Sequence, residues 1–92
     1  MMRLTVIGCY GAYPDPGGAS SGYLLEEGET KVLLDCGSGV LSKLQQVIDL
    51  SELDAVVFSH YHADHCADLG CLHYAAMIDT QLGRRTKPLV LW

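Results

Sequence analysis

The sequence predicts an α/β fold, α+β by some schemes, built on a mixed β-sheet with two helices on one face. Two apolar, strand-like segments flank a short glycine-containing turn, which is the pattern of an antiparallel hairpin. Further along, strand-like and helix-like segments alternate as in a β-α-β unit, whose two strands are parallel. The sheet is therefore expected to contain both kinds of strand pairing.

The first half of the chain predicts three strands. Residues 3–7 are rich in β-branched and other apolar side chains, and the glycines after them permit a tight exit. A long loop with turn-forming residues at 14–18 follows, and loops of this length are usually functional or mobile. Residues 23–26 and 31–34 are expected to form the hairpin, in which Gly28 supplies the positive φ that a short turn requires.

The second half predicts two helices and two more strands. Ser38 is placed to cap a helix whose apolar residues recur at helical spacing, at positions 40, 41, 44, 47 and 48. This helix leads to a strand at residues 55–58 through a crossover that is nearly always right-handed. A second helix is expected over about residues 66–79, weakened by Gly70 near its start, and a last strand follows Pro88.

The stretch directly after residues 55–58 carries the candidate chemistry. Within six residues it holds four potential metal ligands, His60, His62, Asp64 and His65. His60 and His62 are two residues apart, so at an extended strand end both rings project from one face and can bind the same ion. Asp64 and His65 follow a turn and can serve a second ion beside the first. Imidazole and carboxylate ligands together suit zinc, with manganese or iron as alternatives.

Other residues leave alternatives open. Asp35 ends an apolar strand, where its carboxylate either stabilises a turn or helix start or orients a metal ligand. Cys66, Cys71 and His73 allow a mononuclear structural metal site as an alternative. The cysteines lack the short paired spacing of such sites, so packing in the core or at an interface is the expected role of His73. The four cysteines include no Cys-x-x-Cys pair, which indicates a reduced, cytoplasmic protein.

The composition disfavours a protein whose main task is to grip nucleic acid. The formal net charge is −5 and the pI is about 5.1, so the chain as a whole does not attract a phosphate backbone. The basic cluster Arg84, Arg85 and Lys87 is expected in a solvated loop, with contact to a phosphate as the alternative. The sequence shows neither a stretch of membrane-spanning length nor a signal-peptide pattern.

The string His60-x-His62-x-Asp64-His65 at a strand end resembles the signature of the metallo-β-lactamase fold hydrolases. Three other segments share the resemblance, at residues 8–11, 20–25 and 33–39. Together they look most like the branch that contains ribonuclease Z and cyclic-nucleotide phosphodiesterases. The resemblance implies the amino-terminal half of an αββα sandwich. Residues 1–92 would then be the amino-terminal part of a single metallo-hydrolase domain, truncated at its carboxyl end.

The resemblance also implies a function. His60 and His62 would ligate one zinc ion and Asp64 and His65 a second, and a metal-bound hydroxide would attack a phosphodiester in a small molecule or nucleotide. Asp64 would also act in catalysis by steering the water. The remaining ligands come from later in the family's chain, so these 92 residues alone are expected to be inactive. The alternatives are a transfer-RNA 3′-processing endonuclease of the ribonuclease Z type and an inactive metal-binding or dimerising fragment.

Half of a sandwich leaves apolar surface uncovered. We expect one bare sheet face and one unpaired strand edge, both of which favour association. Two copies that pack sheet to sheet would imitate the pseudo-symmetric fold, which predicts a homodimer.

Overall fold

The structure, a computed structural model, describes residues 1–59 and 61–92 of the chain. In chain order the elements are β1 (Met2–Gly8), β2 (Gly22–Glu27), β3 (Thr30–Leu34), α1 (Val40–Leu44), the 3₁₀ helix η1 (Leu50–Glu52), β4 (Ala55–Val57), α2 (Ala63–Cys66), α3 (Leu69–Gln81) and β5 (Val90–Leu91). Among the described residues, no helix combines the length and the apolar character needed to cross a bilayer.

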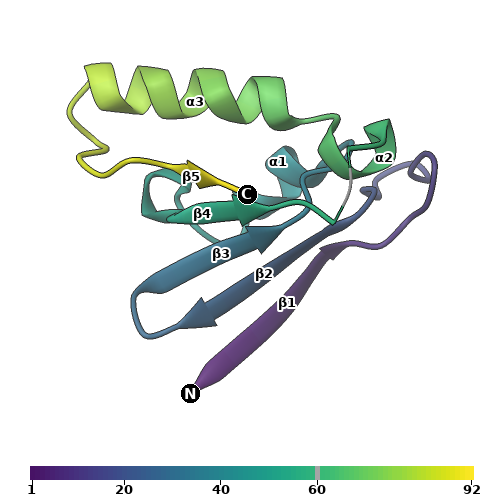
Figure 1. Cartoon of the computed structure of the whole chain (residues 1–92). Helices are drawn as coiled ribbons and strands as arrows, with labels where there is room; N and C mark the ends of the chain where they lie inside the picture. The colour runs from purple at the N-terminus through teal and green to yellow at the C-terminus, as the bar shows by residue number, and fades with distance from the viewer. Residues whose placement is uncertain (60) are drawn as a thin grey trace.

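The five strands form one mixed sheet in the order β1-β2-β3-β4-β5 (Figure 1). β1, β2 and β3 pair antiparallel, whereas β3, β4 and β5 pair parallel. The predicted hairpin joins β2 to β3, and Gly28 in its turn has a φ of +59°. The predicted mixed sheet is therefore confirmed.

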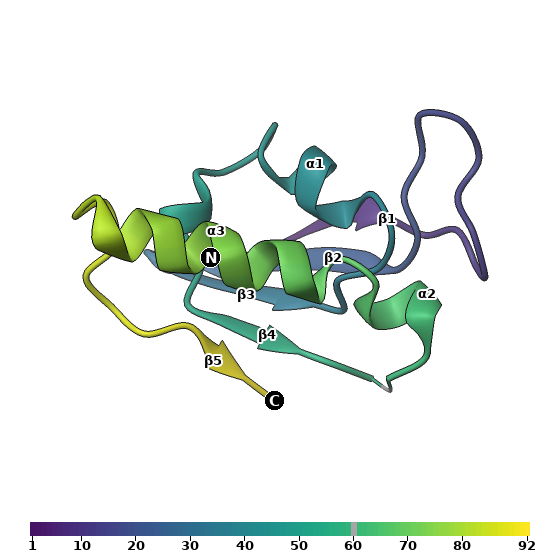
Figure 2. The same cartoon turned by 90° about the horizontal axis from the view of Figure 1, so that it is seen from above.

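Helices α1 and α3 lie over the same face of the sheet (Figures 1 and 2), which confirms the prediction of two helices on one face. The core fills the space between the two layers. Its buried residues are Ile7, Ala19, Leu24, Leu33, Cys36, Val40, Leu44, Ile48, Leu53, Val56 and Leu72. Because side chains alternate along a strand, only every second residue of each strand contributes to this core.

The helix boundaries differ from the prediction. α1 has only five residues, and the residue before it is Gly39, whose backbone is left-handed with φ +83°, so Ser38 does not cap the helix. A Cβ at Gly39 would lie 3.0 Å from the carbonyl oxygen of Gly18, so both the conformation and the packing favour glycine there. Val47 is 45% exposed and stands outside the buried stripe. The second predicted helix is divided into α2 and α3.

The sheet face opposite the helices is apolar and uncovered, as expected for half of a sandwich. By strand alternation and register, it carries Met2, Leu4, Val6, Tyr23, Leu25, Val32, Leu34, Ala55, Val57 and Val90. Leu4 and Val6 are more than half exposed, although both lie within a strand. The strands at the two edges of the sheet are β1 and β5.

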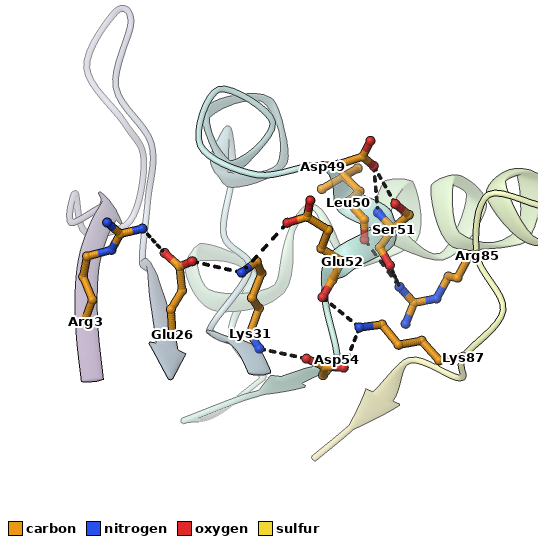
Figure 3. A network of polar contacts seen from close by, with 10 residues as sticks. All are labelled: Arg3, Glu26, Lys31, Asp49, Leu50, Ser51, Glu52, Asp54, Arg85 and Lys87. Atoms are coloured by element: carbon orange, nitrogen blue, oxygen red, sulfur yellow. Dashed lines mark hydrogen bonds and ion pairs between the residues drawn. The ribbon is translucent and has the colours of Figure 1, made fainter. Parts of the chain in front are cut away.

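A row of alternating charges crosses the sheet at the end where its parallel strands begin (Figure 3). Glu26 accepts hydrogen bonds from Arg3 at 3.1 Å and from Lys31 at 3.2 Å. On the next strands, Asp54 accepts from the backbone N–H of Lys31 at 2.8 Å and from Lys87 at 2.7 Å. The row ties all five strands together at this end.

The basic cluster between α3 and β5 is not the solvated loop that the sequence predicted. Arg85 is only 4% exposed and donates hydrogen bonds to the carbonyl oxygens of Leu50 and Ser51 (Figure 3). It also donates to the carbonyl oxygen of Pro88. Arg84 is exposed, as predicted. Lys87 also makes internal contacts, with the carbonyl oxygen of Glu52 and the carboxylate of Asp54.

Candidate metal centre

The predicted ligands follow β4, at the edge of the sheet where the parallel strands end. His60 lies outside the described residues. His62 has extended backbone and immediately precedes α2, whose first turn carries Asp64 and His65. His62 is exposed, whereas Asp64 and His65 are partly buried, with side chains 24% and 18% exposed. The structure therefore brings Asp64 and His65 together on one short helix.

His65 stands between two carboxylates. Its Nδ1 lies 2.8 Å from Oδ2 of Asp35, and its Nε2 lies 3.1 Å from Oδ2 of Asp64. An ionised carboxylate only accepts hydrogen bonds, so the Nδ1 of His65 must donate to Asp35. The Nε2 of a neutral ring then presents its lone pair to the Asp64 carboxylate. Two acceptors at this distance repel each other unless a proton or a metal cation lies between them.

Asp35 is a buried carboxylate, 5% exposed, with several donors around it. It accepts hydrogen bonds from Ser21 Oγ at 2.9 Å, and from the backbone N–H and the hydroxyl of Ser59, both at 2.8 Å. Burial by itself would raise the pKa of Asp35. The bonds from Ser59, His65 and Ser21 outweigh that effect and hold the pKa below its usual value. Asp35 is thus ionised at neutral pH.

The contacts of Asp35 are compatible with both roles that the sequence left open, stabilising a turn and orienting a metal ligand. The bond from the Ser59 N–H stabilises the turn after β4, and the bond from His65 fixes an imidazole that can bind metal. Asp35 also has a φ of +62°, a left-handed conformation that is uncommon outside glycine and several-fold enriched in Asp and Asn. This backbone turns the chain away from β3 directly below the site.

The pair Asp64 and His65 fits a zinc-type ion. Two ligand atoms on one tetrahedral ion with bonds of about 2.0–2.1 Å lie about 3.3 Å apart. The observed 3.1 Å between Asp64 Oδ2 and His65 Nε2 is close to that value. Within residues 1–59 and 61–92, no group of three or more His, Cys, Asp and Glu side chains could hold an ion. Of the four predicted ligands, the structure thus brings Asp64 and His65 within ion-binding distance of each other, and metal binding by them stays a prediction.

Backbone contacts fix α2 beneath the site. Cys36 donates its N–H to the carbonyl of His65 at 2.8 Å, and its own carbonyl accepts from Asp68 N–H at 3.0 Å. A Cβ at Gly37 would lie 2.2 Å from the carbonyl oxygen of Asp64, so this close approach requires glycine. The loop after β3 and helix α2 thus hold each other in place.

The sequence interpretation missed Ser21 and Ser59 as partners of Asp35. Both are small hydroxyl residues, one directly before β2 and the other just after β4. In the sequence, the only indication of this role was that each serine stands beside a strand end. The contacts with Asp35 depend on the order in which the strands pair, which the local sequence does not show. Knowing that β2 and β4 both neighbour β3 would have been enough to find them.

The alternative Cys/His site is not formed. Cys66 points its thiol at the carbonyl oxygens of Tyr61 and His62, each 3.4 Å away. Cys71 and His73 are exposed on α3, so His73 is not a core residue. All these residues are described, and they form no metal-binding group. Burial raises the pKa of Cys36 to about 12, which keeps that thiol protonated.

A carboxylate-oriented imidazole thus lies beyond the end of a parallel strand of a mixed sheet, an arrangement that is common among metal-binding α/β proteins. The family model described as "Metallo-beta-lactamase superfamily" matches residues 15–81 of this chain. The chain belongs to this superfamily.

Individual relatives agree with the family. The chain is 48% identical over 91 residues to "Probable metallo-hydrolase YhfI" of Bacillus subtilis, covering 99% of this chain and 37% of that protein. It is 38% identical over 82 residues to "Ribonuclease Z" of Methanopyrus kandleri, covering 88% of this chain and 29% of the relative. The chain thus spans about a third of the length of these relatives.

Solved structures give the same result. The crystal structure of YhfI superposes with a TM-score of 0.91, covering 98% of this chain and 37% of that one. Human tRNase Z, short form, superposes with a TM-score of 0.76 at 25% identity, covering 97% and 34% of the respective chains. The sheet and helices described above are therefore the amino-terminal half of the metallo-β-lactamase fold.

Proposed function

We propose that this chain is the amino-terminal part of a metal-dependent hydrolase that cleaves phosphodiester bonds. The observation that carries the proposal is the line of contacts from Asp35 through His65 to Asp64. It presents an imidazole lone pair and a carboxylate oxygen to a common position, which a cation would stabilise. The relatives named ribonuclease Z support the phosphodiester as the bond that is cleaved.

The chain's own residues would divide the work. His60 and His62 would hold one ion and Asp64 and His65 the other, with zinc the best match and manganese or iron also suitable. A bound ion supplies Lewis acidity and lowers the pKa of a water molecule. Asp35 fixes the tautomer and orientation of His65, and the second oxygen of Asp64 can accept a hydrogen bond from the attacking water and direct it.

The favoured substrate is a small-molecule or nucleotide phosphodiester. A long nucleic acid needs a basic surface, whereas this chain has a net charge of −5 and uses Arg85 and Lys87 in internal contacts. Transfer-RNA 3′ processing is the second candidate, because relatives that carry the name ribonuclease Z match most of this chain. In that case the rest of the protein would supply the surface that binds RNA.

A chimera tests the proposal. Residues 1–92 replace the matching segment of the Bacillus subtilis relative, and the product is loaded with zinc or manganese. We expect hydrolysis of bis(p-nitrophenyl) phosphate, with little activity on thioesters or lactams, and a loss of at least about 100-fold in His62→Ala. Cleavage of a transfer-RNA precursor alone would favour the second candidate. An inactive chimera beside an active, unaltered relative would refute the proposal.

The isolated 92-residue chain is the matched control for the chimera. We expect it to bind at most one ion loosely and to be inactive. Metal analysis that finds two tightly held ions for each isolated chain would show that the site is complete without further residues.

A further inference from the structure

A hollow of about 310 Å³ lies between the end of β1, the long loop that follows it and helix α1. Its walls include the apolar side chains of Ile7, Pro16 and Ala19, the ring of Tyr10 and the side chain of Lys43 on α1. Figure 2 shows α1 next to the end of β1, where the loop begins. Ligand sites in proteins start at about this volume and combine apolar walls with a few polar groups. Among the described residues, none of the proposed metal ligands lines this hollow.

Backbone contacts hold the walls of the hollow together. The N–H of Ser20 donates to the carbonyl of Ser38 at 2.9 Å, and the N–H of Tyr10 donates to the carbonyl of Ala19 at 3.1 Å. A Cβ at Gly18 would lie 2.6 Å from a carbon of the Tyr10 ring, so the ring packs directly on the glycine backbone. The loop is thus fixed both to the start of α1 and to the end of β1. Walls that are already in place lower the entropic cost of binding a ligand.

Lys43 brings a positive charge to this hollow. Within residues 1–59 and 61–92 it forms no ion pair, whereas every other lysine and arginine contacts a carboxylate or a carbonyl oxygen, namely Arg3, Lys31, Arg84, Arg85 and Lys87. Lys43 is half-buried, and the residues that line the hollow with it include no aspartate or glutamate. The chain as a whole has a net charge of −5, so this hollow is a local exception that attracts an anion.

We propose that the hollow binds a small aryl phosphate, a phosphate monoester that carries a planar ring. Lys43 pairs with the phosphate, which a lysine holds as a point charge, whereas a planar carboxylate is better matched by the fork of an arginine. The ring of the ligand lies among the apolar walls. There it contacts the ring of Tyr10, which is 42% exposed and therefore accessible. The inference does not depend on the proposed function, because no metal ion or proposed metal ligand takes part.

Cys9 serves as the reporter in the test, because its exposed thiol lines the hollow. The 92-residue chain is treated with EDTA and titrated with phenyl phosphate, and alkylation by iodoacetamide is followed cysteine by cysteine with peptide mass spectrometry. We expect saturating phenyl phosphate to slow the alkylation of Cys9 by at least about threefold, because the ligand blocks access to the thiol. Cys71 is also free and exposed but does not line the hollow, so its alkylation rate should stay unchanged.

Variants of Lys43 test the role of its charge. Lys43→Gln removes the charge, and we expect the dissociation constant of phenyl phosphate to rise by at least about fivefold. Lys43→Arg keeps the charge, and we expect the dissociation constant to stay within about threefold of the parent. Inorganic phosphate and phenol each carry one half of the probe. Both should bind at least about tenfold more weakly than phenyl phosphate, because each lacks either the ring or the charge.

Three results would overturn the proposal. The first is that about 10 mM phenyl phosphate does not protect Cys9, which would place any binding below the weakest useful affinity. The second is equal protection of Cys9 and Cys71, and the third is an unchanged dissociation constant in Lys43→Gln. Equal affinities for phenyl phosphate and inorganic phosphate would also overturn it, since they would indicate an adventitious ion only. Circular dichroism checks that each variant is folded, and Lys43→Met replaces Lys43→Gln if the latter does not fold.

Discussion

At the residue scale, the site depends on one carboxylate. Asp35 accepts from two serines and one histidine, and those donors come from three separate places in the chain. It is the only described residue other than glycine with a positive φ. Such a conformation persists when the surrounding contacts determine it, and here the contacts are those that orient His65.

Asp35→Asn is expected to weaken metal binding by about 10–100-fold in the chimera. Asparagine tolerates the left-handed backbone, so the change acts through the side chain. An amide has one oxygen and one NH₂ group, so it cannot accept from Ser21, Ser59 and His65 as a carboxylate does. Affinity is measured for zinc by competition with a chromogenic chelator.

Ser21→Ala is the matched control for Asp35→Asn. It removes one hydrogen bond to the same carboxylate and leaves the contact with His65 in place. We expect zinc affinity to change by less than about threefold. Equal losses in the two variants would mean that Asp35 acts through general packing rather than through the ring of His65.

The proposed metal ligands could be named from the sequence because their spacing is local. His60, His62, Asp64 and His65 stand within six residues, so the motif is visible without knowing the fold. The partners of Asp35 were not predictable in the same way. Ser59 follows Asp35 by 24 residues and meets it only because β3 and β4 pair in parallel.

At the element scale, strands were predicted better than helix ends. The hairpin and β4 follow from local composition, and a glycine marks the turn. The break between α2 and α3 has a tertiary cause. Asp68 lies at the break, where its carboxylate accepts the N–H of Leu41 and its own N–H donates to Cys36. Local sequence contains no signal for contacts with a helix and a loop about 30 residues away.

The row of charges across the sheet predicts a dependence of stability on pH. Hydrogen bonds from Arg3 and Lys31 lower the pKa of Glu26 from its model-peptide value of 4.5. The unfolded chain therefore binds protons more readily than the folded one, and stability rises with pH. The contribution is complete above about pH 5 and is lost as the pH falls through the folded-state pKa.

Glu26→Gln is expected to flatten this dependence. The ion pair of Glu26 with Arg3 adds little to stability because Arg3 is largely exposed, so the pair with Lys31 accounts for most of the effect. Together they contribute about 1 kcal/mol to the free energy of unfolding. The free energy of unfolding is measured by urea titration at pH 6 and at pH 3. The difference between the two pH values should shrink by about that amount in Glu26→Gln. Glu29→Gln, in the exposed hairpin turn, should leave it unchanged, and equal slopes in both variants would contradict the assignment.

At the scale of the whole molecule, the chain has two layers, a sheet and the helices that pack on it, and one face of the sheet is uncovered. The helices cover one face of the sheet, while the other face carries ten apolar side chains and is open. Exposed apolar patches of this extent mark interaction surfaces or favour aggregation. The relatives are about three times as long as this chain. We propose that in a longer protein the additional residues cover this face with a second sheet.

This proposal predicts that a dye which reports exposed apolar surface distinguishes the isolated chain from the chimera. The isolated 92-residue chain should enhance the fluorescence of 1-anilinonaphthalene-8-sulfonate strongly, because the dye can bind the bare sheet. In the chimera the added residues should occupy that face, so the enhancement should fall by at least about fivefold. Glu29→Gln, in the exposed hairpin turn, leaves the apolar sheet face unchanged and should give the isolated chain's full signal. If Leu4→Lys and Val6→Lys together do not lower the signal of the isolated chain, the dye binds elsewhere and the bare sheet is not the surface that it detects.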